Sequence, residues 1–442
     1  MKAWENNIRK VEPYVPGEQP KDTDVIKLNT NENPYPPAPE VGKAVMDTDI
    51  DRLRLYPDPD VTELVSAIAD YYGMNKNQVF VGVGSDDVLS MCFLTFFNGN
   101  KPVLFPDITY SFYSVWADLY RIPYEKQALD EDFNIKPQDY YKENGGVIFP
   151  NPNAPTGLYM GLDKVRDIIE HNRDVVVIVD EAYIDFGGQS AKELVNEYDN
   201  VLVVQTFSKS RSMAGMRIGY AFGSPKLIKA LNDVKFSFNS YTMNMTSIKY
   251  GVASINDKAY FDECVGKIIA TREKAKESLT KLGFTFTDSK ANFIFATHKS
   301  VPAKEIFENA RNLDVCVLIF TLDCCYIFHA DEDEIQRKIA QKAKFKVIED
   351  YDIDFLKDEK IAKILYEKRD MDYLKQLAKK LPESIQETCS IAFSSGRYLE
   401  MNTKGVDKGY GMRWLVNYLG YDMDETIGIG DNYNDVEMIK TA

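Results

Sequence analysis

A lysine flanked by hydroxyl side chains follows one of the apolar runs of this sequence. Residues 201–205 are predicted to form a strand, and Thr206, Ser208 and Lys209 come directly after it. A lysine held at such a position can form a Schiff base with a carbonyl compound, provided that its amine is neutral for part of the time. Taken alone, Lys209 is more often a solvated surface lysine, so neighbouring strands have to supply further evidence.

A carboxylate ends the preceding predicted strand. Asp180 follows the apolar residues 175–179, and Tyr183 comes three residues later. A carboxylate at a buried strand end needs a cationic partner. A protonated pyridine nitrogen would be such a partner, and Tyr183 could then bind a phenolate oxygen on the same ring. The competing interpretation of Asp180 is a helix cap.

A glycine-containing turn could bind an anionic group of the same ligand. Gly84, Ser85 and Asp86 join a predicted strand to a predicted helix. Free amides and the helix dipole at such a turn favour a phosphate, and Arg217 could add a bidentate guanidinium. Tyr110 could stack on the face of the ring, although a core position is the more usual role of a tyrosine.

The elements that must position these residues are short apolar runs that alternate with helical patterns. The runs predicted as strands are residues 79–83, 103–105, 147–149, 175–179 and 201–204. Continuous apolar runs separated by helices predict an α/β fold with a mostly parallel sheet that is buried on both faces. Ligands of such sheets bind at the carboxyl ends of the strands, where the candidate residues are found.

The composition disfavours several classes of function. Among 442 residues, 53 Lys and Arg against 68 Asp and Glu give a net charge of −15, which argues against nucleic acid and anionic membranes as partners. Three histidines are too few for a multi-histidine metal site, so proton transfer must depend on Lys, Asp, Glu or Tyr. Six cysteines without a CxxC pair, and no apolar run long enough to cross a bilayer, predict a cytoplasmic protein with reduced thiols.

Taken together and in order, these motifs resemble those of the fold-type I aminotransferases, which use pyridoxal 5′-phosphate (PLP). They are most similar to the histidinol-phosphate aminotransferases. The resemblance covers about residues 3–315 and rests on residues 31–35 (NENPY), 56–59 (YPDP), 84–86 (GSD), 109–110 (TY), 151–157 (NPNAPTG), 180–183 (DEAY) and 206–209 (TFSK).

The resemblance implies a role for each matching residue. Lys209 would hold PLP and move the proton during catalysis, Asp180 would pair with the pyridinium nitrogen, and Tyr183 would bind the ring oxygen. The other cofactor-binding residues would be Gly84, Ser85, Asp86, Thr206, Ser208 and Arg217 at the phosphate, Tyr110 on the ring face, and Tyr56 from the other subunit of a homodimer. Tyr14 and Asn33 would bind the substrate.

Two departures from the family pattern concern binding. Ala154 replaces the second Asn of the family's Asn-Pro-Thr-Gly turn, so one hydrogen bond to the ring oxygen, worth on the order of 1 kcal/mol, is lost. The C-terminal arginines that clamp the substrate in the family are not found, since the corresponding residues 315–320 read VCVLIF. We therefore expect cofactor chemistry at Lys209 to be better preserved than substrate affinity.

The C-terminal part resembles a different family, the haloacid dehalogenase-like phosphatases with a large cap. The resemblance covers about residues 326–442 and rests on residues 394–400 (SSGRYLE), Lys408, and residues 428–435 (GIGDNYND). It implies that Asp431 and Asp435 would bind Mg²⁺. The family's nucleophile is the first Asp of an Asp-x-Asp-x-Thr motif at a strand end near the start of the domain, and no such strand end is found there. We therefore expect an incomplete segment without a functional Mg²⁺ site or phosphatase activity.

The expected architecture has four parts. They are an N-terminal arm over residues 1–35, a PLP-binding large domain over 36–255, an incomplete small αβ domain over 256–320 and a partial haloacid dehalogenase-like α/β segment over 321–442. The expected activity is transamination between histidinol phosphate or imidazole-acetol phosphate and 2-oxoglutarate or glutamate, as in histidine biosynthesis. The alternatives are a PLP enzyme for another phosphorylated amine, such as a phosphothreonine decarboxylase, a PLP-binding but impaired fusion, and a bifunctional transaminase–phosphatase.

Overall fold

The chain forms two compact α/β units. The computed structural model describes residues 3–11, 27–304, 316–321, 323–330, 332–348, 354–357, 360–381, 383–429 and 436–441. The first unit is made of residues 1–20 and 27–302, and the second of residues 21–26 and 303–442. Among the described helices, none is both long and apolar enough to cross a membrane.

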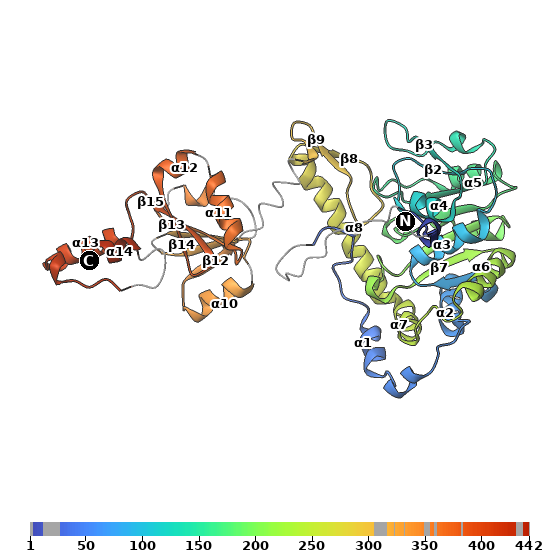
Figure 1. The fold of residues 1–442 in the computed structure, drawn as a ribbon, viewed down its shortest axis with the longest axis horizontal. Helices are drawn as coiled ribbons and strands as arrows, with labels where there is room; N and C mark the ends of the chain where they lie inside the picture. Colours follow the sequence, from blue (N-terminus) through green and yellow to red (C-terminus); the bar gives the residue numbers. More distant parts are fainter. Residues whose placement is uncertain are drawn as a thin grey trace. The chain divides into compact units, whose positions relative to one another are not determined.

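The first unit is built on a seven-stranded sheet with the strand order β1-β7-β6-β5-β4-β2-β3 (Figure 1). The strands are β1 (Val79–Gly82), β2 (Val103–Pro106), β3 (Tyr124–Gln127), β4 (Gly146–Pro150), β5 (Val177–Asp180), β6 (Val201–Thr206) and β7 (Gly219–Gly223). Strand β7 runs antiparallel to both of its neighbours, whereas the other pairs are parallel. The predicted mostly parallel sheet is confirmed.

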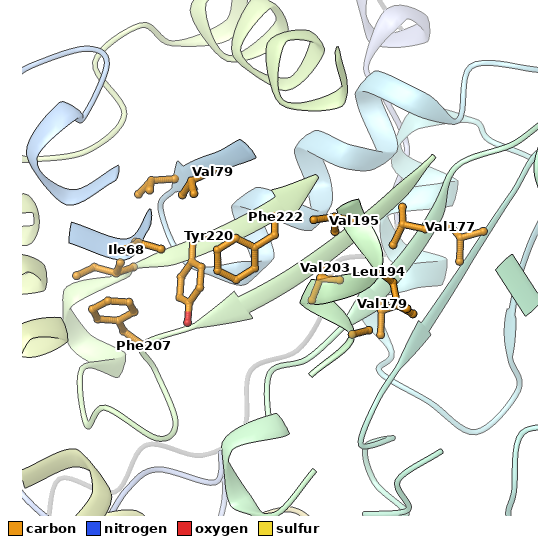
Figure 2. Close-up of a cluster of buried hydrophobic side chains, with 14 of the residues drawn as sticks. Ile68, Val79, Val177, Val179, Leu194, Val195, Val203, Phe207, Tyr220 and Phe222 are labelled. Carbon is orange, nitrogen blue, oxygen red and sulfur yellow. The ribbon is translucent and has the colours of Figure 1, made fainter. Parts of the chain in front are cut away.

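Helices cover both faces of this sheet because alternate strand residues point to opposite sides. Val147 and Phe149 of β4 belong to one core, together with residues of α2, α5 and α7, whereas Ile148 belongs to the other core, with residues of α3, α4 and α6. Figure 2 shows part of the first core, where side chains of β5, β6 and β7 gather. The helices of this region are α1 (Pro39–Met46), α2 (Thr62–Tyr72), α3 (Ser85–Phe96), α4 (Phe112–Tyr120), α5 (Leu162–Glu170), α6 (Pro225–Phe238) and α7 (Met245–Asn256).

A long helix, α8 (Lys258–Lys281), and a two-stranded sheet of β8 (Phe284–Phe286) and β9 (Ala296–His298) complete the first unit. The buried guanidinium of Arg272 in α8 donates to the carbonyls of Phe186 at 2.8 Å and Ala291 at 2.9 Å. These bonds fasten α8 to the loop that follows β5, which carries the predicted site residue Tyr183.

The second unit is built on a six-stranded sheet with the strand order β12-β11-β10-β13-β15-β14. The strands are β10 (Cys316–Thr321), β11 (Cys325–Phe328), β12 (Phe345–Ile348), β13 (Ile361–Glu367), β14 (Cys389–Ser394) and β15 (Tyr398–Thr403). The helices are α10 (Glu332–Ala340), α11 (Met371–Lys380), α12 (Glu383–Thr388), α13 (Lys408–Leu419) and α14 (Val436–Thr441). Leu318, Ile327 and Leu365 are among the buried residues of its core.

Strand β10 determines where the second unit begins. The sequence predicts that residues 316–320 end an incomplete small αβ domain over residues 256–320. In the structure, β10 pairs antiparallel with both β11 and β13, so these residues lie inside the second sheet and the unit boundary falls at 302–303.

Candidate active site

Three strands of the first unit bring the predicted site residues to one edge of the sheet. Gly219 at the start of β7 lies opposite Gly82 of β1 and Thr206 of β6, so these residues form one row across the sheet. Asp180 ends the next strand, β5. Because β1, β5 and β6 run in the same direction, the segments that follow them emerge at the same edge.

The amine of Lys209 lies in this region and is partly dehydrated. Its Nζ donates to the carbonyl of Thr30 at 2.5 Å and lies 5.7 Å from the centre of the Tyr183 ring. Burial lowers the pKa of Lys209 to about 8, although the carboxylates of Asp86 and Glu32 oppose this shift. About a tenth of the amine is therefore neutral at pH 7, far more than for an ordinary lysine, and Schiff-base chemistry uses this neutral form.

The carboxylate of Asp180 is buried, with 4% of the residue exposed. It accepts hydrogen bonds from the hydroxyl of Tyr113 at 2.8 Å and from the backbone N–H of Ala182 at 3.2 Å. Burial raises the pKa of Asp180 to about 6 in spite of these two bonds. No ion pair of Asp180 is found among the described side chains, so a buried carboxylate here would be stabilised by a cationic ligand.

The hydroxyl of Tyr183 faces the N-terminal segment. It accepts a hydrogen bond of 3.0 Å from the side-chain amide of Asn31, and the tyrosine ring packs edge-on against Phe293 with the centroids 5.1 Å apart. Burial raises the pKa of Tyr183 to about 12. The hydroxyl therefore keeps its proton at neutral pH and is able to donate it to an acceptor.

The predicted phosphate cradle is crowded and depends on two glycines. Gly84 precedes α3 with a φ of +87°, and a Cβ there would lie 2.4 Å from a nitrogen of the Arg217 guanidinium. A Cβ at Gly219 would lie 2.2 Å from the carbonyl carbon of Gly84 and 2.3 Å from the nitrogen of Ser85. Glycine at both positions lets the start of α3, with its free amides, approach Arg217 and β7 closely.

Polar side chains around this cradle bind one another. Asp86 accepts from the hydroxyl of Tyr110 at 2.7 Å and forms an ion pair with Arg217 at 3.1 Å. The hydroxyl of Thr206 donates to that of Ser208 at 3.0 Å. Asp86, Tyr110 and Arg217 thus bind one another at the start of α3, and Thr206 and Ser208 form a separate pair after β6.

The remaining predicted site residues are more scattered. Asn33 donates to the carbonyls of Lys209 at 2.9 Å and Ser210 at 3.3 Å, so its amide supports the loop of the lysine. Tyr56 is 81% exposed and stacks on Tyr241 with the ring centroids 4.7 Å apart. Tyr14, Asp431 and Asp435 lie outside the described residues, and Lys408 is the first residue of α13 in the second unit.

Asn153 fastens the turn that contains Ala154 to a neighbouring loop. The buried side chain of Asn153 accepts from the hydroxyl of Thr109 at 3.0 Å and donates to the carbonyl of Ile108 at 3.0 Å. The side-chain amide of Asn153 is thus already hydrogen-bonded to this loop. Ala154 has no polar side chain with which to reach a ligand.

Three features of the site were not found from the sequence. Asn31 binds Tyr183, Tyr113 binds Asp180, and the carbonyl of Thr30 accepts from Lys209. Tyr113 lies one helical turn after the predicted Tyr110, which was a usable signal. The contacts of Thr30 and Asn31 join segments more than 150 residues apart, and their residue types are ordinary in a loop.

The side chains present fit PLP. A buried carboxylate that needs a cation, a lysine with a lowered pKa, and a glycine-lined helix start beside an arginine match the pyridine nitrogen, the aldehyde and the phosphate of this cofactor. Among the described residues, no group of three His, Cys, Asp or Glu side chains could hold a metal ion. The fold and the site together define a PLP-dependent enzyme of fold type I.

Comparisons with known proteins identify the family. Residues 23–336 match the sequence model of the aminotransferase class I and II family. The histidinol-phosphate aminotransferase of Lactococcus lactis subsp. cremoris (strain MG1363) is 53% identical over 306 residues, which are 69% of this chain and 86% of the relative. That of Clostridium beijerinckii is 50% identical over 319 residues, which are 72% of this chain and 89% of the relative. The chain belongs to the class I and II aminotransferases, enzymes that act on small-molecule substrates.

Solved structures agree in fold. The histidinol-phosphate aminotransferase from Clostridium acetobutylicum matches with a TM-score of 0.60 at 22% identity, covering 64% of this chain and 86% of that structure. The enzyme from Sinorhizobium meliloti, solved in complex with PLP, matches with a TM-score of 0.57 at 21% identity, covering 61% and 75%. Residues 287–442 match the sequence model of haloacid dehalogenase-like hydrolases, as the C-terminal motifs predicted.

Proposed function

We propose that this chain transfers an amino group between histidinol phosphate and 2-oxoglutarate, or in reverse between glutamate and imidazole-acetol phosphate, with PLP bound at Lys209. The observation that carries the proposal is that Asp180 ends β5 and Lys209 follows the neighbouring strand β6 at the same sheet edge, beside the glycine-lined start of α3. The names of relatives about 50% identical over most of their length support the choice of substrate.

Each proposed residue has a task that its surroundings favour. Bound PLP supplies an electron-accepting ring. The carboxylate of Asp180 stabilises a proton on the ring nitrogen, because an ion pair in a buried place is strongly favoured over a lone charge. The amine of Lys209, whose pKa is lowered by burial, would bind the cofactor. It would then act as a general acid and base, taking the proton from the amine-bearing carbon of the substrate and delivering it to the aldehyde-derived carbon of the cofactor.

The phosphate of the cofactor has its own set of groups in this proposal. The amides at the start of α3 and the guanidinium of Arg217 bind it, with the hydroxyls of Thr206 and Ser208 beside them. On phosphate binding, Arg217 exchanges part of its present ion pair with Asp86 for a bond to the ligand. Binding energy from the phosphate of the substrate would position the amine for reaction.

A homodimer in the cytoplasm is part of the same proposal. Leu53, Leu55 and Tyr56 are exposed side by side in the sequence, and burial of such apolar surface favours association. In the dimer, Tyr56 would reach the cofactor phosphate of the partner subunit. Light scattering of the purified protein at two concentrations tests this expectation, since a monomer at both would remove Tyr56 from the site.

The proposal is tested by visible spectroscopy of the purified protein with PLP, before and after addition of histidinol phosphate. We expect a visible absorbance band that converts to the pyridoxamine form, and no band in Lys209→Ala. A circular dichroism spectrum of Lys209→Ala that matches the wild type would show that the loss is local. A wild-type protein without any band would overturn the assignment of Lys209.

A second candidate function is a protein that binds PLP but turns over histidinol phosphate poorly. The observation that favours it is the pairing of residues 316–321 within the second sheet, at the place where the family carries a substrate-binding arginine. A band that forms but does not respond to histidinol phosphate would select this candidate. A response to phosphothreonine with release of CO₂ would instead indicate a decarboxylase.

A phosphatase activity is not part of the proposal. The match to haloacid dehalogenase-like hydrolases begins at residue 287. The chain contains two Asp-x-Asp-x-Thr sequences, residues 58–62 and 422–426, but the first comes after η2 (Ile50–Arg54) and the second after α13, so neither stands at the end of a strand, where that family carries its nucleophile. Phosphate release from histidinol phosphate that requires Mg²⁺ and is lost in Asp431→Asn would contradict this view.

A further inference from the structure

The hydrogen bond between Asn31 and Tyr183 has a defined direction. The side-chain amide nitrogen of Asn31 donates and the hydroxyl oxygen of Tyr183 accepts, at 3.0 Å. A phenol carries a single proton. Because Asn31 occupies the oxygen as a donor, the proton of Tyr183 has to point elsewhere.

The segment that carries Asn31 is fastened to the site at several points. The side chain of Asn292 donates to the carbonyl of Asn31 at 3.0 Å, and the carbonyl of Thr30 accepts from Lys209. Thr30 and Asn31 both have left-handed backbone conformations, with φ of 60° and 53°. Residues other than glycine adopt this conformation only at a cost in free energy. Asparagine tolerates this conformation better than most residues.

The ring of Tyr183 is also fixed, so the hydroxyl has little freedom of position. Phe293 packs edge-on against it, and the amine of Lys209 lies 5.7 Å from its centre. What remains free is the rotation of the O–H bond itself. A donor on one side of the oxygen restricts that rotation.

We propose that Asn31 is a positioning residue that turns the hydroxyl proton of Tyr183 toward the ring oxygen of the bound cofactor. This inference rests on the proposed function, since it requires PLP at Lys209. It matters more in this chain than in a relative with asparagine at position 154, because Ala154 offers no second donor and Tyr183 is left to stabilise the ring oxygen.

The charged groups around Tyr183 set the background for a measurement. They are Lys209 after β6, Asp180 at the end of β5 and Asp86 in α3, of which the two carboxylates raise the pKa of the tyrosine. Asn31 itself carries no charge. A change at Asn31 to another neutral residue therefore alters the proton direction of Tyr183 without adding a charge to this set.

The test is the pH midpoint at which the visible band of the PLP-loaded protein changes, compared between wild type and Asn31→Gly. Glycine accepts the φ of 53° without strain, so the backbone of the segment is kept. A donor to the ring oxygen favours its negatively charged form. Loss of the aligned proton should therefore raise the midpoint by about 0.5–1 pH unit, as expected for one hydrogen bond.

A double-mutant cycle separates this effect from others. Tyr183→Phe should raise the midpoint at least as much, and Asn31→Gly should add nothing further in the Tyr183→Phe background. Equal shifts from Asn31→Gly in both backgrounds would overturn the inference.

Asn292→Ala is the matched control for docking of the segment. It removes the bond to the carbonyl of Asn31 but leaves the amide that reaches Tyr183. A midpoint like that of the wild type supports a specific role of the Asn31 side chain, and a shift as large as that of Asn31→Gly contradicts it. Failure of the proposed function would be distinguishable, because the wild-type protein would then show no band with PLP.

Discussion

The hydroxyl of Tyr113 in α4 donates a hydrogen bond of 2.8 Å to the carboxylate of Asp180 at the end of β5. The side chain of Tyr113 is completely buried. It therefore closes one side of the Asp180 carboxylate to a ligand. The bond fixes which face of Asp180 is left for a ligand. A core residue thereby determines the orientation of a residue in the proposed active site.

We predict that Tyr113→Phe weakens PLP binding several-fold and destabilises the first unit by about 1 kcal/mol. The hydrogen bond lowers the pKa of Asp180, so its loss leaves less of the carboxylate ionised. PLP titration and urea unfolding measure the two effects. Tyr140→Phe is the control, because the buried hydroxyl of Tyr140 has no hydrogen-bond partner among the described residues, and its removal should change neither quantity.

The stability of the protein without PLP should fall as the pH rises from about 4 to 7. Burial raises the pKa of Asp180 to about 6 and that of Glu181 to about 7. Between the ordinary carboxyl value and these pKa values the folded state holds protons that the unfolded chain has lost, so raising the pH favours unfolding. The shift of Asp180 corresponds to a contribution on the order of 3 kcal/mol.

This pH dependence is measured by urea unfolding at pH 4.5 and 7.5, followed by the fluorescence of Trp116 in a Trp4→Phe and Trp414→Phe background. We expect a smaller difference between the two pH values in Asp180→Asn, since the amide does not titrate. Asp70→Asn, on the exposed side of α2, should behave like the wild type. An undiminished difference in Asp180→Asn would show that other groups cause the pH dependence.

Gly219→Ala is predicted to damage the phosphate cradle. The added Cβ would meet the backbone of Gly84 and Ser85 at 2.2 and 2.3 Å, and backbone atoms cannot move aside as a flexible side chain can. We expect a loss of stability of about 1–3 kcal/mol and a PLP affinity reduced at least tenfold. Gly266→Ala in α8, where a Cβ would meet nothing within 4 Å, should be neutral or slightly stabilising. Equal PLP affinities of the two variants would contradict the inference that the phosphate cradle has no room for a Cβ at position 219.

In the second unit, Arg397→Met should cost far more than Arg369→Met. Both guanidinium groups lie 2.8 Å from Asp333, but Arg397 is buried and also binds the buried Glu367 at 2.7 Å. Removing it leaves a buried carboxylate without this cation, which costs roughly 3–5 kcal/mol. Hydrogen exchange of the β13 and β15 amides should speed up in Arg397→Met only, with β5 and β6 unchanged in both variants. Equal exchange in the two variants would mean that burial of the pair contributes nothing.

The strand-end residues could be predicted because parallel sheets impose a simple pattern. Short apolar runs locate the strands, and the polar residues that follow them must meet at one edge. Lys209, Asp180 and Gly84 were found in this way. The strand pattern does not predict the partners of these residues, because Asn31 and Tyr113 act across 152 and 67 residues of sequence.

The boundary between the two units shows a different limit of the sequence. Residues 316–320 form a short apolar run, which predicts a strand but does not specify its neighbours. The sequence models of two families match overlapping segments, residues 23–336 and residues 287–442. Pairing with β11 and β13 depends on chain that follows, so only the folded arrangement assigns this strand.

Each described residue proposed to bind the cofactor precedes position 302, within the first unit. An exchange of genetic material downstream of that position would leave the cofactor site untouched while altering whatever the later residues recognise. The later residues can therefore change without replacing any described residue that is proposed to bind PLP.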